Sequence, residues 1–169
     1  MSRKTQEERR HNGQREHVTP GLLYLKQRDG RHHPLLRAVA PEKAAPVLSL
    51  IDATMGVAGD AIHIARILPE VSIMGCEASP VLHALLEEGL PRLRADASRP
   101  WSDAVRRIKA LWVNAGDYLA GLSDDSVDVV YLDPMFTAPL AAPAGFTVVR
   151  QFALDQPPSL GLLDHARRV

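Results

Sequence analysis

Short apolar runs alternate along the chain with segments whose apolar residues recur at helical spacing. Residues 47–51 and 127–132 are the most nearly continuous apolar runs, which is typical of strands that are covered on both faces. Residues 60–68 instead place their apolar side chains on one helical face, with Ala61, Ile64, Ala65 and Leu68. Strands that alternate with helices predict an α/β fold, in which a parallel sheet carries helices on both faces.

Cap and turn residues set the boundaries of these elements. Pro34 and the pair Ser79-Pro80 are typical of a helix start, and Gly89 is typical of a helix end. The predicted strands are residues 47–51, 71–76, 110–113 and 127–132. The predicted helices are residues 33–39, 80–89, 102–108 and 159–168 besides 60–68, with a short helix or turn at 117–122.

The chain has 169 residues, of which 46% are apolar and 24% charged, enough for one globular domain and too few for two. Residues 1–18 are polar and are expected to form a flexible arm, and residues 19–169 to form the domain. No apolar run approaches the roughly 20 residues that cross a bilayer. The single cysteine, Cys76, lies in a predicted strand and is expected to pack in the core. Because one cysteine excludes an internal disulfide, we expect a reducing, cytoplasmic location.

The charges balance, with 20 Lys and Arg against 20 Asp and Glu, so only local patches could attract nucleic acid. One basic segment stands out, and it would either contact RNA phosphates or form a solvated face. Its members are Arg92, Arg94, Arg99, Arg106, Arg107 and Lys109. His63 and His83 are expected near the surface, and no His or Cys group has the spacing of a metal site.

Polar residues follow each of the four predicted strands. They are Asp52, Glu77, the segment 114–117 and Asp133. Parallel strands end at the same edge of a sheet, and ligands of open α/β sheets bind beyond that edge. The sequence therefore predicts one ligand site built from these four strand ends.

The segment after the first strand, Asp-Ala-Thr-Met-Gly-Val-Ala-Gly-Asp over residues 52–60, contains two glycines. Glycine lets backbone N–H groups approach a ligand closely. The spacing of Gly56 and Gly59 does not match the G-x-G-x-x-G pattern of dinucleotide binding, and Asp52 suits a cationic ligand better than a pyrophosphate. S-adenosylmethionine (SAM) is a ligand of that kind, while an ordinary strand-to-helix turn is the alternative.

Two further strand ends offer groups for a nucleoside. Glu77 could accept both hydroxyls of a ribose, since two carboxylate oxygens match a vicinal diol, or it could be a capping carboxylate. Asp117 could accept from an adenine amino group while Gly116 lets the ring lie against the backbone. The alternative for that segment is a turn in which a side chain caps the next helix.

The fourth strand ends in Asp-Pro-Met-Phe, residues 133–136. Pro134 holds Asp133 in an extended conformation, so that its carboxylate and a nearby carbonyl can project together. These acceptors could bind the hydrogens of an exocyclic amine while Phe136 stacks on the base. A loop Asp-Pro next to a core phenylalanine is the alternative.

Together these motifs resemble the class I SAM-dependent methyltransferases, whose sheet is Rossmann-like. The likeness over residues 19–169 is in particular to bacterial 16S rRNA guanine-N2 methyltransferases of the small ribosomal subunit. The resemblance implies that SAM is lined by Gly59, Asp60, Glu77, Ala78, Gly116, Asp117 and Asp133, with Asp52, Thr54 and Gly56 shaping the site. It also implies that residues 133–136 receive the target amine. Ala58 departs from the family pattern, where a second glycine is common.

The family sheet has seven strands, whereas this sequence shows four and the first residues of a fifth, so the domain is expected to lack its last strands. Methyl transfer from SAM to guanine N2 of small-subunit rRNA, without a metal, is the predicted activity. A non-catalytic remnant that binds SAM is one alternative. An enzyme acting on an amine of DNA, protein or a small molecule is another.

Overall fold

The structure is a computed structural model that describes residues 33–41, 45–134, 151–153 and 159–169. The predicted N-terminal arm and Phe136 lie outside the described residues. No described helix combines the length and the apolar character that a bilayer span needs.

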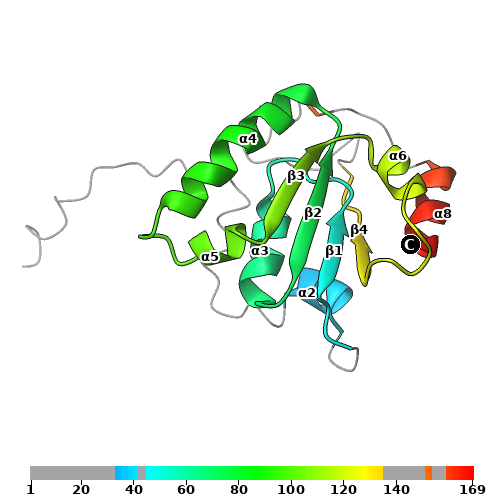
Figure 1. Cartoon of the computed structure of the whole chain (residues 1–169), viewed down its shortest axis with the longest axis horizontal. Coiled ribbons are helices and arrows are strands. Elements are labelled where there is room, and N and C mark those ends of the chain that lie inside the picture. The colour runs from blue at the N-terminus through cyan, green and yellow to red at the C-terminus, as the bar shows by residue number, and fades with distance from the viewer. Residues whose placement is uncertain (1–32, 42–44, 135–150, 154–158) are drawn as a thin grey trace, which may run out of the picture.

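The core of the fold is a parallel sheet in the order β3-β2-β1-β4 (Figure 1). Its strands are β1 (Ser49–Asp52), β2 (Ser72–Glu77), β3 (Ile108–Trp112) and β4 (Val129–Tyr131). In the register, Asp52 is opposite both Gly75 of β2 and Tyr131 of β4, and Glu77 is opposite Trp112. The predicted Rossmann-like α/β sheet is therefore confirmed.

Helices cover both faces of this sheet because successive strand residues point to opposite sides. The helices are α2 (Pro34–Val39), α3 (Gly59–Ile67), α4 (Pro80–Ala95), α5 (Ser102–Val105), α6 (Ala115–Ala120) and α8 (Leu160–Arg168). Leu50, Ile73 and Ile108 pack in one apolar cluster with α2, α3, α4 and α5. Ile51 and Cys76 pack in the other with α6 and the end of α8.

Helix α4 is longer than predicted, because it continues through Gly89 and Pro91 to Ala95. Its buried stripe of Leu82, Leu86 and Leu90 extends past Gly89, and burial of that stripe outweighs the helix-breaking tendency of the two residues. Pro91 lies on the exposed side of the helix, where water can bind the carbonyl group that loses its N–H partner.

Other boundaries differ from the predictions by one to three residues, and the largest of these differences is between α5 and β3. Strand β3 begins at Ile108 instead of Ala110, and α5 ends at Val105 instead of Ile108. Ile108 is fully buried and is opposite Ile73 of β2, so tertiary packing assigns it to the strand.

His63 is buried, so its predicted surface position is wrong. Only 3% of the residue is exposed, and neither ring nitrogen has a hydrogen-bond partner in the described structure. Its ring meets that of His33 edge to face, with the centroids 4.9 Å apart. Burial, helped by nearby His33 and Arg66, lowers the pKa of His63, which keeps the ring neutral.

Arg168 connects helix α8 to α6 and to the turn that follows α6. The Arg168 guanidinium donates to the carbonyls of Leu119 and Leu122 and to the Asp124 carboxylate, at 2.6–2.9 Å. Next to it, the Val169 carbonyl accepts the Val127 N–H at 2.9 Å, so residue 169 lies beside the segment that leads into β4. This packing brings the amino end of α8 to the ligand edge of the sheet, where Ser159 and Leu162 line a pocket.

Candidate active site

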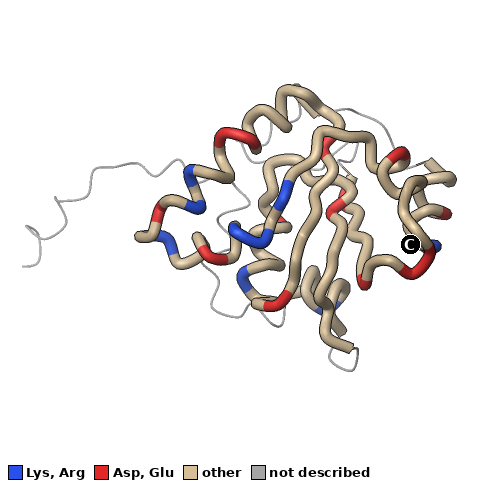
Figure 2. Tube along the Cα trace, in the orientation of Figure 1, with Lys and Arg blue, Asp and Glu red and all other residues tan. Residues whose placement is uncertain are grey.

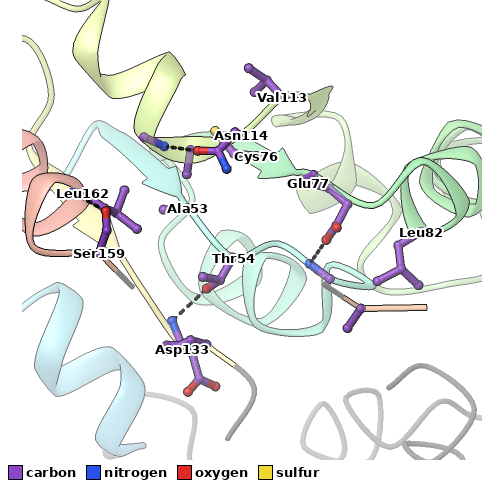
Figure 3. A pocket seen from close by; sticks show the side chains of 16 residues that line it. Ala53, Thr54, Cys76, Glu77, Leu82, Val113, Asn114, Asp133, Ser159 and Leu162 are labelled. Atoms are coloured by element: carbon purple, nitrogen blue, oxygen red, sulfur yellow. Dashed lines mark hydrogen bonds between the residues drawn. The ribbon is translucent and has the colours of Figure 1, made fainter. Parts of the chain in front are cut away.

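All four strands end at one edge, where the structure has a pocket of about 210 Å³ (Figure 3). The predicted residues Thr54, Gly56, Glu77, Ala78, Gly116, Asp133 and Pro134 line its wall. Asp52, Gly59, Asp60 and Asp117 are not part of the wall. The structure thus brings most of the predicted site residues together, from segments up to 80 positions apart in the sequence.

The segment after β1 folds over the end of β2. The Met55 N–H donates to the Cys76 carbonyl at 3.1 Å, and the Gly56 N–H donates to Glu77 Oε2 at 2.8 Å. The Met55 side chain packs directly on Gly75, where a Cβ atom would lie 1.9 Å from its sulfur. A glycine in β2 is therefore what allows the loop to close over the strand.

Two residues of this loop have left-handed backbone conformations. Gly56 has φ of +53°, and Ala58, the residue before α3, has φ of +61°. Glycine adopts this region without strain, which gives a physical reason for the glycine common in the family at the position of Ala58. The Ala58 side chain is fully buried in the core.

Glu77 combines structural contacts with a place on the pocket wall. Its second carboxylate oxygen accepts the Ser79 N–H at 2.7 Å, so each oxygen already holds one backbone N–H. Each carboxylate oxygen can accept a further hydrogen bond, so these contacts leave room for the predicted ribose diol. Burial raises the pKa of Glu77, and the N–H bonds partly oppose that shift.

Asp133 lies across Thr54 from Glu77 (Figure 3). Its backbone N–H donates to the Thr54 hydroxyl at 2.8 Å, which ties the end of β4 to the loop after β1. Its side chain is exposed at the pocket, and partial loss of solvent together with nearby Asp60 raises the pKa of the carboxyl. Pro134 also lines the wall, whereas Phe136 falls outside the described residues.

Asp52, Asp60, Glu77 and Asp133 form an acidic cluster, of which Glu77 and Asp133 line the pocket. Asp52 is 2% exposed, its carboxylate accepts the Thr54 N–H at 3.1 Å, and burial together with the other three acids raises its pKa to about 7. Asp60 accepts a hydrogen bond from the Tyr131 hydroxyl at 2.8 Å, and burial and this acid raise the pKa of Tyr131. This concentration of acid suits a positively charged ligand.

The segment after β3 contains the helix cap that the sequence offered as the alternative, and it also lines the pocket. The Asn114 side chain accepts the Gly116 N–H at 2.8 Å and caps α6, as the capping alternative predicted. Asn114 and Gly116 also line the pocket. Asp117 is exposed in the first turn of α6, and its contact with adenine stays a prediction.

Several residues of the site were not predicted from the sequence, among them three from α8 and β4. Ser159 and Leu162 come from α8, and Tyr131 supports Asp60 from within β4. The sequence predicted a helix over residues 159–168 but no place for it at the pocket, where Ser159 caps α8 by accepting the Leu162 N–H at 3.1 Å. The described residues contain no group of three or more His, Cys, Asp or Glu that could hold a metal ion. Cys76 is buried as predicted, and burial raises its pKa to about 12.

A family model described as "Putative SAM-dependent methyltransferase" matches residues 9–142. The chain belongs to this family. The match includes all the residues predicted to bind SAM or the target amine, from Asp52 to Phe136.

Curated relatives are similar over much of this chain. Ribosomal RNA small subunit methyltransferase J of Marinobacter nauticus is 34% identical over 122 residues, covering 72% of the chain and 42% of that protein. The protein of the same name from Laribacter hongkongensis is 37% identical over 107 residues, covering 63% and 36%. Uncharacterized protein YpiP of Bacillus subtilis is 30% identical over 141 residues, covering 83% and 53%. The chain thus spans about half or less of the length of these relatives.

Proposed function

We propose that this protein transfers a methyl group from SAM to the exocyclic N2 amine of a guanine in 16S ribosomal RNA. The single observation that carries the proposal is that Glu77 and the Asp133-Pro134 segment line one pocket, where both carboxylates belong to the acidic cluster. The names of the relatives in Marinobacter and Laribacter support a ribosomal RNA substrate of the small subunit.

The residues present suit SAM. Glu77 is placed for the ribose hydroxyls, Ala78 and Gly116 line the wall where the adenine would lie, and the acidic cluster favours the positive charge. SAM supplies a methyl group on a sulfonium, which is already a good leaving group. The protein therefore mainly has to hold the amine in line with that methyl group, and such alignment can lower a barrier by about 7–11 kcal/mol.

Asp133 is the residue that would orient the amine. Its carboxylate accepts an N–H of the amine and stabilises the positive charge that develops on nitrogen as the new N–C bond forms. The nitrogen then loses one proton to this carboxylate or to solvent, so that a neutral methylated amine and a neutral thioether remain. The raised pKa of Asp133 favours acceptance of that proton.

Replacement of Asp133 tests this role. We expect Asp133→Ala to lower methyl transfer by at least roughly 100-fold, because the amine loses its acceptor. SAM affinity, measured by calorimetry, should weaken only a few-fold. The control is Glu70→Gln, an exposed carboxylate at the other edge of the sheet, which should leave both quantities unchanged. Retained turnover in Asp133→Ala would refute the assigned role.

The substrate class needs a separate experiment. Radiolabelled SAM is offered with the protein to small ribosomal subunits, DNA and protein fractions, and labelled RNA is digested to nucleosides. Label in N2-methylguanosine supports the proposal, and label in DNA or protein contradicts it. SAM binding without label in any fraction would favour the non-catalytic remnant.

A further inference from the structure

The basic segment singled out in the sequence gathers at one end of the molecule, where acidic residues lie between the basic ones. Figure 2 shows Lys and Arg gathered where the end of α4, α5 and the start of β3 meet. Hydrogen bonds hold these parts together, because the Arg94 guanidinium donates to the Val105 and Ile108 carbonyls and Arg106 donates to the Arg94 carbonyl. The position of the charges is therefore fixed by the fold.

The basic side chains of this surface divide into two kinds. The guanidinium groups of Arg94 and Arg107 donate hydrogen bonds to backbone carbonyls, so these two side chains stabilise the fold. Arg92, Arg106 and Lys109 are exposed, with the Arg92 and Arg106 side chains 75% and 64% exposed, although Arg106 also donates to the Arg94 carbonyl at 3.4 Å. Ion pairs so exposed contribute little, so the pairs of Arg92 with Glu88 and of Arg106 with Asp103 are easily replaced by a stronger anion.

Strand β3 leads from this basic surface to the pocket. Lys109 lies near its start, and Trp112 at its end is 65% exposed, which is unusual for so large a ring. The Trp112 indole N–H donates to the carbonyl of Ala78, a pocket residue, at 3.2 Å, and its ring stacks near His83. Among the described strands β3 has only β2 as a neighbour, so its outer edge is not paired there.

We propose that Arg92, Arg106, Lys109 and Trp112 form a binding surface for single-stranded RNA, with phosphates on the basic side chains and one base stacked on Trp112. The inference rests on the proposed function in so far as this RNA flanks the target guanine. Positive side chains next to an exposed aromatic ring are the combination that binds single strands without reading sequence. Lys109 and Trp112 lie about 10 Å apart along β3, and their side chains leave opposite faces of the sheet, so an RNA segment of one to two nucleotides would follow the outer edge of β3 to contact both.

Salt-dependent RNA binding by the full chain tests the surface. The probe is a fluorescently labelled single-stranded RNA of twelve nucleotides, and anisotropy gives its affinity between 50 and 200 mM salt. For Arg106→Gln with Lys109→Gln, we expect affinity at low salt to fall about tenfold or more. The slope of log K against log salt should become shallower by about 1.4, or about 0.7 for each lost phosphate contact.

Two further variants make the result specific. The matched control, Arg37→Gln with Arg167→Gln, removes two exposed arginines elsewhere and should keep the affinity and slope of the wild type. Trp112→Ala should weaken binding about tenfold with an unchanged slope, since a stacked ring contributes no ion release. Equal losses in the basic-surface variant and the control, or no loss in either, would overturn the proposal.

The RNA-binding surface and the proposed methyl transfer can be refuted independently of each other. Calorimetry with SAM should give the same affinity for the basic-surface variant and the wild type. Wild-type protein that binds RNA through this surface but methylates no RNA refutes the proposed function and leaves the surface standing. A basic-surface variant that methylates RNA with the wild-type KM refutes the surface and leaves the proposed function standing.

Discussion

The Thr54 hydroxyl links two segments of the site that are far apart in the sequence. It lines the pocket, and its oxygen accepts the N–H of Asp133, 79 positions later in the sequence. The residue therefore connects the loop after β1 with the Asp133-Pro134 segment, which we propose receives the target amine.

We expect Thr54→Val, which keeps the shape and removes the acceptor, to lower kcat for methyl transfer roughly 10- to 100-fold, because Asp133 loses its anchor. Unfolding free energy should fall by about 1 kcal/mol for the lost hydrogen bond. Thr54→Ser keeps the hydroxyl and should retain most of the activity. Steady-state kinetics and chemical denaturation measure the two effects, and a larger loss in the serine variant would contradict this role.

At the scale of elements, the site depends on a loop that crosses a strand. The loop after β1 reaches Cys76, Glu77 and the surface of Gly75 in β2. Met55 is 3% exposed and belongs to the apolar core. The absence of a side chain at Gly75 thus positions both the Gly56 N–H and the Glu77 carboxylate.

Gly75→Ala should lower the unfolding free energy by about 1–3 kcal/mol, because the new methyl group displaces Met55. SAM affinity should weaken as well, since the loop moves away from the pocket. The matched control is Gly89→Ala in α4, where a Cβ would meet nothing within 4 Å. That change should stabilise the helix by about 0.5–1 kcal/mol. Thermal denaturation and SAM calorimetry compare the pair, and a neutral Gly75→Ala would contradict the account.

At the scale of the whole molecule, repulsion within the acidic cluster lowers the stability of the folded state, and a bound cation would reduce that repulsion. Its acids come from β1, α3, β2 and the segment after β4, and Tyr131 faces them from β4. Asp52 is held protonated up to about pH 7 by burial and by the neighbouring acids. In the unfolded chain the same carboxyl ionises near pH 4.

Two opposite pH effects should follow. Without ligand, Asp52 binds a proton between about pH 4 and 7 in the folded state but not in the unfolded state. The stabilisation of the folded state by this proton is therefore lost as pH rises through about 7. A bound cation favours the ionised carboxylate, so SAM affinity should instead strengthen from pH 6 to 8. Asp52→Asn should flatten both trends relative to wild type, as measured by thermal denaturation and calorimetry. An unchanged pH profile in this variant would show that Asp52 does not titrate in this range.

The sequence by itself determined the alternation of strands and helices and the placement of polar residues at the strand ends, because both are written in local periodicity and caps. Asp52, Glu77 and Asp133 meet at one edge simply because parallel strands end together. Only the tertiary structure decided the burial of His63, the length of α4, the contact of Met55 with Gly75 and the Thr54–Asp133 and Tyr131–Asp60 hydrogen bonds. Most of these contacts join residues about 20 to 80 positions apart, and no pattern within a single segment can encode which distant side chain will lie against it.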